Sequence, residues 1–94
     1  MAILTLPVKG EYFDKIKAGE KTEEYRLCTS YWKKRIEGRM YDQVVLTRGY
    51  PKRTDQSRRL VVPWRGWKMR TITHPHFGSA PVTVYAIVVD VTRQ

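Results

Sequence analysis

Apolar and polar positions change their spacing several times along the first 42 residues of the chain. Tyr12, Phe13 and Ile16 fall on one face of a helix, and lysines fall on the opposite face. Gly19 follows at a position where helices often end in a left-handed residue. The pattern predicts a strand at Ala2–Leu6, a helix at Val8–Ala18 opened by Pro7, a strand at Thr22–Leu27 and a helix at Tyr31–Glu37 capped by Thr29 or Ser30.

The rest of the chain has mostly β-type patterning. Val82–Thr92 is the longest strand signal, and its apolar residues fall on both faces, as in a central strand that is covered on both sides. Shorter strands are predicted at Gln43–Arg48, Leu60–Val62 and Trp67–Thr73, with loops at Lys52–Arg59 and His74–Gly78. The sum is an α+β fold in a single domain, residues 1–94, with five or six mostly antiparallel strands curled into a small barrel and two helices.

Composition supports a folded chain and excludes several classes of protein. A hydrophobic content of 41%, with three tryptophans and six tyrosines, excludes global disorder. Cys28 is the only cysteine, so an internal disulfide and a cysteine-based zinc cluster are excluded, and we expect no disulfide-linked partner. The longest apolar run is too short for a bilayer, and Met1–Leu4 lacks the basic residues of a signal peptide. We therefore expect a cytoplasmic protein with no membrane partner.

Charge narrows the choice of partner. The chain has 18 basic and 9 acidic residues, which gives a formal net charge of +9. The first 42 residues are nearly balanced, whereas residues 43–94 contain nine bases against Asp55 and Asp90. A field of this sign attracts polyanions, and nucleic acid is the first candidate.

One segment combines charges with a turn signal: residues 19–26 have the pattern G-x-K-x-x-E-x-R. In a strand, Thr22, Glu24 and Arg26 share one face, and Gly19 lets the chain turn so that Lys21 lies over the same cleft. An acid between two bases can form a structural ion-pair network. Alternatively, Arg26 can hold a phosphate through two hydrogen bonds. The residues alone leave both interpretations open.

This pattern, placed between an amphipathic helix and a strand in a small basic chain, resembles the signature of the ASCH domain family. That family consists of small β-barrel proteins related to the PUA domains of RNA-modifying enzymes. The resemblance implies a PUA-like barrel with a ligand cleft at this segment. It also implies three possible activities, because some members bind RNA, some look like single-strand ribonucleases that need a divalent metal, and a small bacterial group hydrolyses acetylcytidine.

The hydrolytic alternatives assign different roles to the same residues. In a ribonuclease, Lys21 or a histidine would act as acid or base, Glu24 as base or metal ligand, and Arg26 on the phosphate charge. A divalent metal ion is the only cofactor this suggests, and no set of metal ligands is predicted. In the acetylcytidine hydrolases, the resemblance gives Lys21 the activation of water or of the nucleophile, together with Thr22 and Arg26. That group has threonine at the position of Glu24 and needs a further downstream glutamate, and this chain has no glutamate after Glu37.

Three other residues are candidates for chemistry, and each has a structural alternative. His74 and His76 are either acid–base groups or metal ligands, or simply the polar tip of a hairpin. Cys28 is expected to be a small buried hydrophobe and not a nucleophile.

Aromatic and basic residues interleave between residues 48 and 70. Unpaired bases stack on aromatic rings while nearby cations neutralise phosphates, so this mixture is typical of surfaces that bind single strands. The alternative is that Trp64 and Trp67 belong to the core and that the cations form a solvated face. The candidate substrate-binding residues are Thr22, Arg26, Arg48, Tyr50, Arg65, Trp67, Lys68 and Arg70.

The leading hypothesis is an RNA-binding ASCH domain whose basic cleft is centred on Lys21, Glu24 and Arg26, with single-strand-specific RNA cleavage as an extension. One alternative is an amidohydrolase that deacylates a modified cytidine nucleoside with Lys21 as the reactive amine. Another is a non-catalytic protein-interaction module. The expected partner is therefore RNA, as a single strand or a modified nucleoside.

Overall fold

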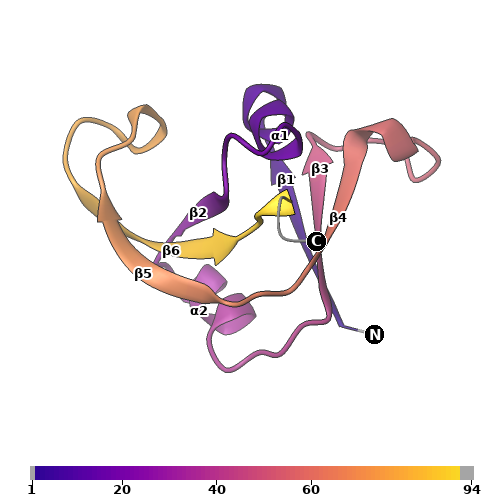
Figure 1. Ribbon diagram of the computed structural model, residues 1–94. Helices are drawn as coiled ribbons and strands as arrows, with labels where there is room; N and C mark the ends of the chain where they lie inside the picture. The colour runs from indigo at the N-terminus through magenta and orange to yellow at the C-terminus, as the bar shows by residue number, and fades with distance from the viewer. Residues whose placement is uncertain (1, 92–94) are drawn as a thin grey trace.

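Two three-stranded sheets form the framework of the protein (Figure 1). The computed structural model describes residues 2–91, apart from the side chain of His76. One sheet consists of β1 (Ile3–Val8), β3 (Gln43–Arg48) and β4 (Arg59–Pro63), and the other of β2 (Glu23–Leu27), β5 (Trp67–Ile72) and β6 (Val82–Val88). The helices are α1 (Gly10–Lys17), α2 (Ser30–Ile36) and the short 3-10 turns η1 (Gln56–Arg58) and η2 (Pro75–Phe77).

The first sheet has the strand order β1-β3-β4. β1 runs parallel to β3, with Leu6 opposite Leu46, and β4 pairs antiparallel to β3, with Leu60 opposite Leu46. Alternate residues of β1, namely Leu4, Leu6 and Val8, are buried. One face of this sheet is therefore directed into the core, as the period of two requires.

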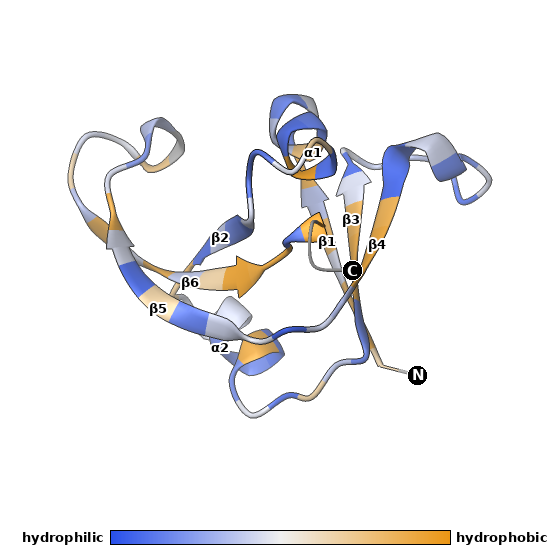
Figure 2. Cartoon of the chain, in the orientation of Figure 1, coloured by the Kyte–Doolittle hydropathy of each residue, from blue (hydrophilic) through white to orange (hydrophobic). Residues whose placement is uncertain are grey.

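The second sheet has the order β2-β6-β5, and β6 pairs antiparallel with both neighbours. Four consecutive residues of β6, from Val84 to Ile87, are buried. The prediction of a central strand covered on both faces is confirmed. Figure 2 shows the contrast with β5, which is largely hydrophilic where β6 is mostly apolar.

The core joins the two sheets through the helices. Phe13 and Ile16 of α1 and Ile36 of α2 are at most 2% exposed, and they belong to one cluster with buried residues of both sheets. Each such side chain contributes about 1.5–3 kcal/mol through removal of its apolar surface from water. The α+β class and the two helices of the sequence prediction are thus confirmed.

Local sequence signals determine where α1 ends and where α2 begins, on either side of the segment 19–26. Gly19 has φ +80°, the left-handed conformation expected after a helix. The backbone N–H groups of Glu20 and Lys21 then donate to the carbonyl of Lys15, at 2.9 and 3.2 Å, so the segment folds back beside α1. At α2, the Thr29 hydroxyl accepts from the backbone N–H of Trp32, as an N-cap should.

Several predicted boundaries are wrong. Pro7 lies inside β1 and does not open α1, which begins at Gly10. β1 is an edge strand, where a residue without an N–H donor is tolerated, so the proline does not end it. β2 begins at Glu23, which leaves Thr22 just outside it, and β6 ends at Val88. Thr92, the predicted end of that last strand, lies outside the described residues.

Cys28 also differs from its prediction, because it is exposed and not buried. It follows the last residue of β2 and therefore lies beyond the pairing of that strand with β6. Its Sγ atom lies 3.9 Å from the Sδ atom of Met69, which is itself half exposed.

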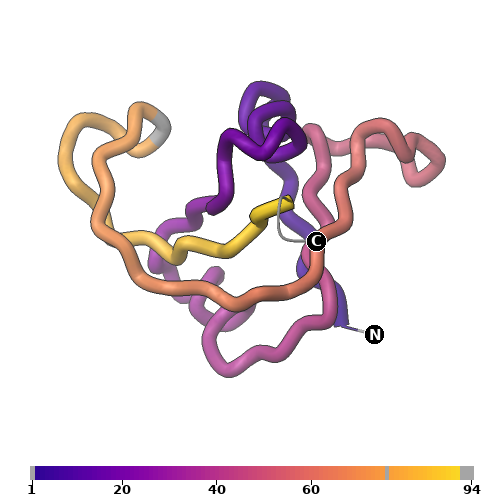
Figure 3. Tube along the Cα trace, viewed as in Figure 1, coloured from indigo at the N-terminus to yellow at the C-terminus, as the bar shows by residue number. Residues whose placement is uncertain are grey.

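The sheets do not close on each other within the described residues, where hydrogen-bonded pairing leaves two separate sheets and no closed barrel. In the same view, the loops at residues 49–58 and 73–81 project on either side of α1 (Figure 3). Among the described residues, no helix has the length and apolar character needed to cross a membrane.

Candidate functional site

A cleft of about 430 Å³ lies where α1, β2, α2 and the end of β1 meet. This volume falls within the range of about 300–1,000 Å³ that is usual for small-ligand sites. Its lining is rich in aromatic side chains and cations, and Glu24 is its only acid among the described residues. The rings belong to Tyr12, Tyr25, Tyr31, Trp32, Tyr50, His74 and Phe77, and the cations are Lys9, Lys21, Arg26 and Arg35.

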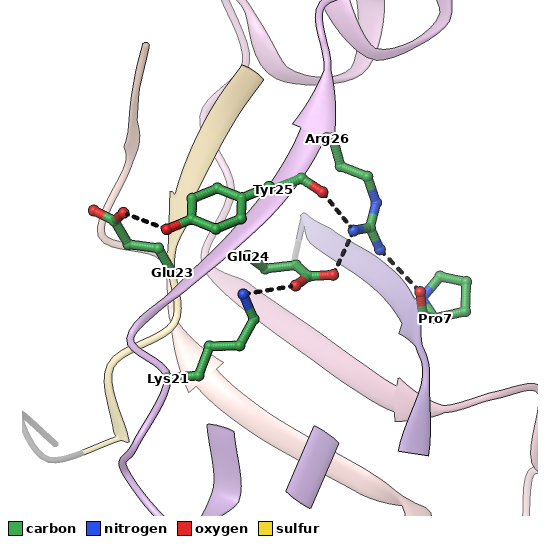
Figure 4. A network of polar contacts seen from close by, with 6 residues as sticks. All are labelled: Pro7, Lys21, Glu23, Glu24, Tyr25 and Arg26. Atoms are coloured by element: carbon green, nitrogen blue, oxygen red, sulfur yellow. Dashed lines mark hydrogen bonds and ion pairs between the residues drawn. The ribbon is translucent and has the colours of Figure 1, made fainter. Parts of the chain in front are cut away.

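Glu24 lies at the centre of the polar part of this cleft (Figure 4). It is 5% exposed, and its two carboxylate oxygens face two different cations. Oε1 lies 3.5 Å from the Nζ atom of Lys21, and Oε2 accepts from Nη1 of Arg26. A carboxylate this deeply buried remains charged only when it is paired, so the two cations hold it in place.

Arg26 connects the two sheets below the cleft. Nη1 donates to the carbonyl of Tyr25 at 2.8 Å as well as to Glu24, and Nη2 donates to the carbonyl of Pro7 in β1 at 2.9 Å. Its guanidinium carbon also lies 5.2 Å from the ring centroid of Trp32. Protein acceptors therefore already occupy three of the five donors that an arginine has. In this arrangement Arg26 orients Glu24 and anchors β2 to β1.

Lys21 presents its ammonium group between aromatic faces. Nζ lies 4.4 Å from the ring centroid of Tyr25 and 5.6 Å from that of Tyr12, and the side chain is 14% exposed. Both rings attract the cation through their π-electrons. An ammonium group has three donors, so Lys21 can donate to a ligand while it stays paired with Glu24.

The tyrosines that flank Lys21 are neutral hydrogen-bonding groups. Burial raises the pKa of Tyr12 above its usual value, with smaller contributions from the negative charges of Glu11 and Glu24. Burial likewise raises the pKa of Tyr25, together with the charge of Glu23 and the hydrogen bond to it. Both phenols therefore keep their protons near neutral pH, and the hydroxyl of Tyr25 already donates to Glu23 at 3.4 Å.

Aromatic contacts build the walls of the cleft. The ring of His74 packs edge-on against Tyr12 and Tyr25, with centroids 5.6 and 6.4 Å apart. On the opposite side, Tyr31 packs edge-on against Trp32 at 5.1 Å. Tyr50 is 93% exposed and borders the opening. Flat apolar walls of this kind suit a planar heteroaromatic ligand.

The structure brings together only part of the predicted site. Lys21, Glu24, Arg26 and Tyr50 line the cleft. Thr22 borders a smaller adjoining hollow that it shares with Lys21 and other residues. The alternation of β2 places Glu24 and Arg26 on the same side, whereas Glu23 is directed away from them, as Figure 4 shows.

The predicted binding residues between positions 48 and 70 are not part of this cleft, except for Tyr50. Arg48 pairs with Asp14 at 3.6 Å, and both Lys68 and Arg70 pair with Glu23, at 3.4 and 2.7 Å. Trp67 packs edge-on against buried Tyr85 and supports the core, while Arg65 is exposed after β4. Trp67 therefore lies where the alternative prediction placed it, against the core.

Several lining residues are not among the predicted site residues, although the sequence contains a signal for some of them. Residues 31–35 read Tyr-Trp-Lys-Lys-Arg and contain the same mixture of rings and cations as residues 48–70. The sequence places Tyr12 on the apolar face of the first helix, and both Tyr12 and Trp32 are partly buried against the core. Only the packing of the helices against the sheets shows that these rings also border a cleft.

The described residues do not fit a divalent metal ion. No group of three or more histidines, cysteines and acids in that part of the chain could hold one. Glu24 is enclosed by two cations, and a metal ion there would be repelled by both. Of the two histidines considered from the sequence, His74 lines the cleft, whereas the side chain of His76 lies outside the described part of the chain.

Comparisons of the chain with models of protein families, with curated proteins and with solved structures found no significant match. The interpretation of the cleft therefore rests on its own geometry and chemistry.

Proposed function

We propose that the protein binds single-stranded RNA by taking one unpaired base, with its sugar, into the cleft. The observation that supports this is the lining: aromatic rings on both walls, four cations, and one acid that is already paired. Unpaired bases are recognised by stacking on rings together with hydrogen bonds to their edges, and cations balance the phosphates. The net charge of +9 favours the same class of ligand.

The proposal extends to the family and the location of the protein. The G-x-K-x-x-E-x-R segment and the alternation of strands and helices around it support an ASCH domain of PUA-like type, in which the two sheets correspond to an open form of the barrel. A chain of this kind, with a single cysteine, would act in the cytoplasm, where RNA is available.

Lys21 has the best position to contact the bound base. Its ammonium group can donate to a carbonyl oxygen or a ring nitrogen of the base while Glu24 fixes its direction. Glu24 acts mainly as a positioning residue, because both of its oxygens already face cations. If the bound strand is cleaved, Lys21 and Glu24 are the acid–base pair, and Lys21 also stabilises charge on the phosphate.

Binding is tested by fluorescence anisotropy with labelled single-stranded RNA at low micromolar protein and at several salt concentrations. Affinity should fall steeply with salt. Lys21→Ala should weaken binding about tenfold, which corresponds to about 1.4 kcal/mol, because it removes the donor inside the cleft. The matched control is Lys52→Ala, which removes the same charge from an exposed loop position outside the cleft. Equal losses in the two variants, or no salt-sensitive binding, would contradict the proposal.

A second candidate function is deacylation of a modified cytidine, and the size of the cleft favours it, because the volume suits one nucleoside. In that reaction water adds to the acyl carbon, the amide C–N bond breaks, and the amine of the cytidine leaves with a proton. Lys21 would donate to the acyl oxygen or orient the water. The departure is that such hydrolases have threonine at the position of Glu24 and a glutamate further along the chain, whereas Glu24 is the only acid among the described lining residues.

Turnover separates these candidates. Release of carboxylate from an acylated cytidine should hardly respond to salt, because that nucleoside is neutral, whereas RNA binding should respond strongly. Cleavage of single-stranded RNA is followed on a gel, with Mn²⁺ and with EDTA. If neither RNA nor nucleoside binds, and Lys21→Ala changes only the free energy of unfolding, the chain is a non-catalytic protein-interaction module.

A further inference from the structure

The outer face of α2 carries a groove that the cleft does not account for. Ser30, Tyr31, Lys34, Arg35 and Arg39 line this hollow, whose volume is about 430 Å³. Tyr31 and Arg35 line the cleft as well. The groove and the cleft therefore form one continuous surface that extends from Lys21 across α2.

The cations of this groove are not neutralised by any acid within residues 2–91, as far as ion pairs are concerned. Lys34, Arg35 and Arg39 are all exposed. Arg39 donates through Nε to the backbone carbonyl of Lys34 at 3.1 Å, which holds the guanidinium group of Arg39 beside α2. Their charges thus stay available to an anion from solution.

A stacking surface lies at the junction of the groove with the cleft. The ring of Tyr31 is 56% exposed, and the guanidinium carbon of Arg35 lies 4.3 Å from its centroid. Tyr31 is in turn supported edge-on by Trp32 in the wall of the cleft. An exposed ring beside a planar cation is the combination on which a second, unstacked base can rest.

The basic region between residues 48 and 70 is less suited to binding a single-stranded nucleic acid. Four of its eight cations, Arg48, Arg58, Lys68 and Arg70, pair with an acid, and none of the eight lines the cleft. A phosphate that approached these four would have to compete with these carboxylates. The larger number of cations between residues 48 and 70 is therefore not the better guide to the path of a polyanion.

We propose that the backbone of the single strand leaves the cleft across α2, where Lys34 and Arg39 contact its phosphates and Tyr31 stacks on the neighbouring base. This inference rests on the proposed function, because it requires a nucleotide in the cleft. It adds a second subsite and a direction: the ligand is an oligonucleotide of at least a few residues, and a single nucleoside fills only part of the surface.

The experiment compares a mononucleotide with a single-stranded RNA about eight nucleotides long, a length typical of such sites. Lys34→Gln/Arg39→Gln removes two charges from the groove, and the matched control Lys52→Gln/Arg53→Gln removes two exposed charges from the loop at residues 49–58. Affinity is measured by calorimetry or anisotropy between about 50 and 200 mM salt.

The groove variant should bind the mononucleotide as the wild type does. Its salt slope for the oligonucleotide should be smaller by about 1.4, since each phosphate contact to a single strand contributes about 0.7. The loss of affinity over that fourfold change in salt then shrinks about sevenfold. The control variant should keep the slope of the wild type within about 0.3.

The possible contrary results differ for the two proposals. If the wild type binds the mononucleotide as tightly as the oligonucleotide, or if both double variants lose the same slope, the path across α2 is wrong and the cleft is unaffected. If the wild type binds neither ligand, the proposed function is wrong, and the path is wrong with it. Circular dichroism of each variant checks whether the fold is retained.

Discussion

Glu23 and Glu24 are neighbours in β2, and each of them pairs with two cations, but the two side chains lie on opposite faces of the strand. Glu24 is nearly buried among the rings of the cleft, with partners that are 14% and 15% exposed. The partners of Glu23, Lys68 and Arg70, are 56% and 41% exposed.

The same charge pattern therefore has two different meanings. An exposed ion pair is weakened by water and salt and contributes little, typically 0–1 kcal/mol. A buried pair contributes little net stability either, but the loss of one partner leaves a charge without compensation. The cluster around Glu24 thus has a defined geometry into which a ligand can fit, whereas the cluster around Glu23 connects β2 to β5 across β6 on the surface.

Replacement of each glutamate by glutamine gives the largest expected contrast. Glu24→Gln should lower the free energy of unfolding by about 3 kcal/mol, because two cations lose their counter-ion in a buried site. Glu23→Gln should lower it by less than about 1 kcal/mol. Urea denaturation at neutral pH measures both. Equal costs for the two variants would mean that the two clusters are equivalent after all.

Replacement of Trp32, which lines the cleft, and of Trp67, which lies in β5, tests the same contrast. Trp32→Leu removes a wall of the cleft and should weaken RNA binding about tenfold, by about 1.4 kcal/mol. Trp67→Leu should leave binding unchanged and lower the free energy of unfolding by about 1–2 kcal/mol, since Trp67 packs on the core. Anisotropy and denaturation on both variants check this. If Trp67→Leu binds RNA more weakly while its stability is unchanged, β5 is part of the binding site.

The smallest expected effect is a pH dependence of the free energy of unfolding that arises from Glu23. A hydrogen bond from Arg70, above all, lowers the pKa of Glu23 below its ordinary value of 4.5, and Lys68 adds to this while burial opposes it. The stability contributed by this pair is therefore present above about pH 4.5 and is lost as the pH falls through the lower pKa of the folded state. Because the pair is partly exposed, we expect less than about 1 kcal/mol.

Urea midpoints of the wild type and of Glu23→Gln, compared at about pH 6 and about pH 3, measure this contribution. The difference between the two proteins should shrink in acid. A difference that grows instead would mean that the carboxyl group of Glu23 destabilises the folded state.

The elements that were predictable from the sequence are those set by local chemistry. The left-handed Gly19, the cap at Thr29 and the two-sided burial of β6 follow from short patterns. The common side of Glu24 and Arg26 follows from the alternation within one strand. Lys21, Glu24 and Arg26 of the segment 19–26 line the cleft.

The remaining part of the site depends on contacts between distant elements. The pairing of Glu23 with Lys68 and Arg70 is set by the order β2-β6-β5, which places two strands on either side of a third. The pattern of charges along the chain cannot show this, so these bases were assigned to a ligand surface. The contribution of α2 depends in the same way on its packing beside β2.

The hydrogen bond from Arg26 to the carbonyl of Pro7 has a further consequence, because it crosses from one sheet to the other directly below the cleft. A ligand held by Lys21 and the surrounding rings would bind only when the two sheets are docked. Its binding energy is then linked to the folding of the whole chain: a ligand present at 100 times its Kd would stabilise the native state by about 2.7 kcal/mol. Occupancy of the cleft would thus slow hydrogen exchange in both sheets together, including strands that the ligand never touches.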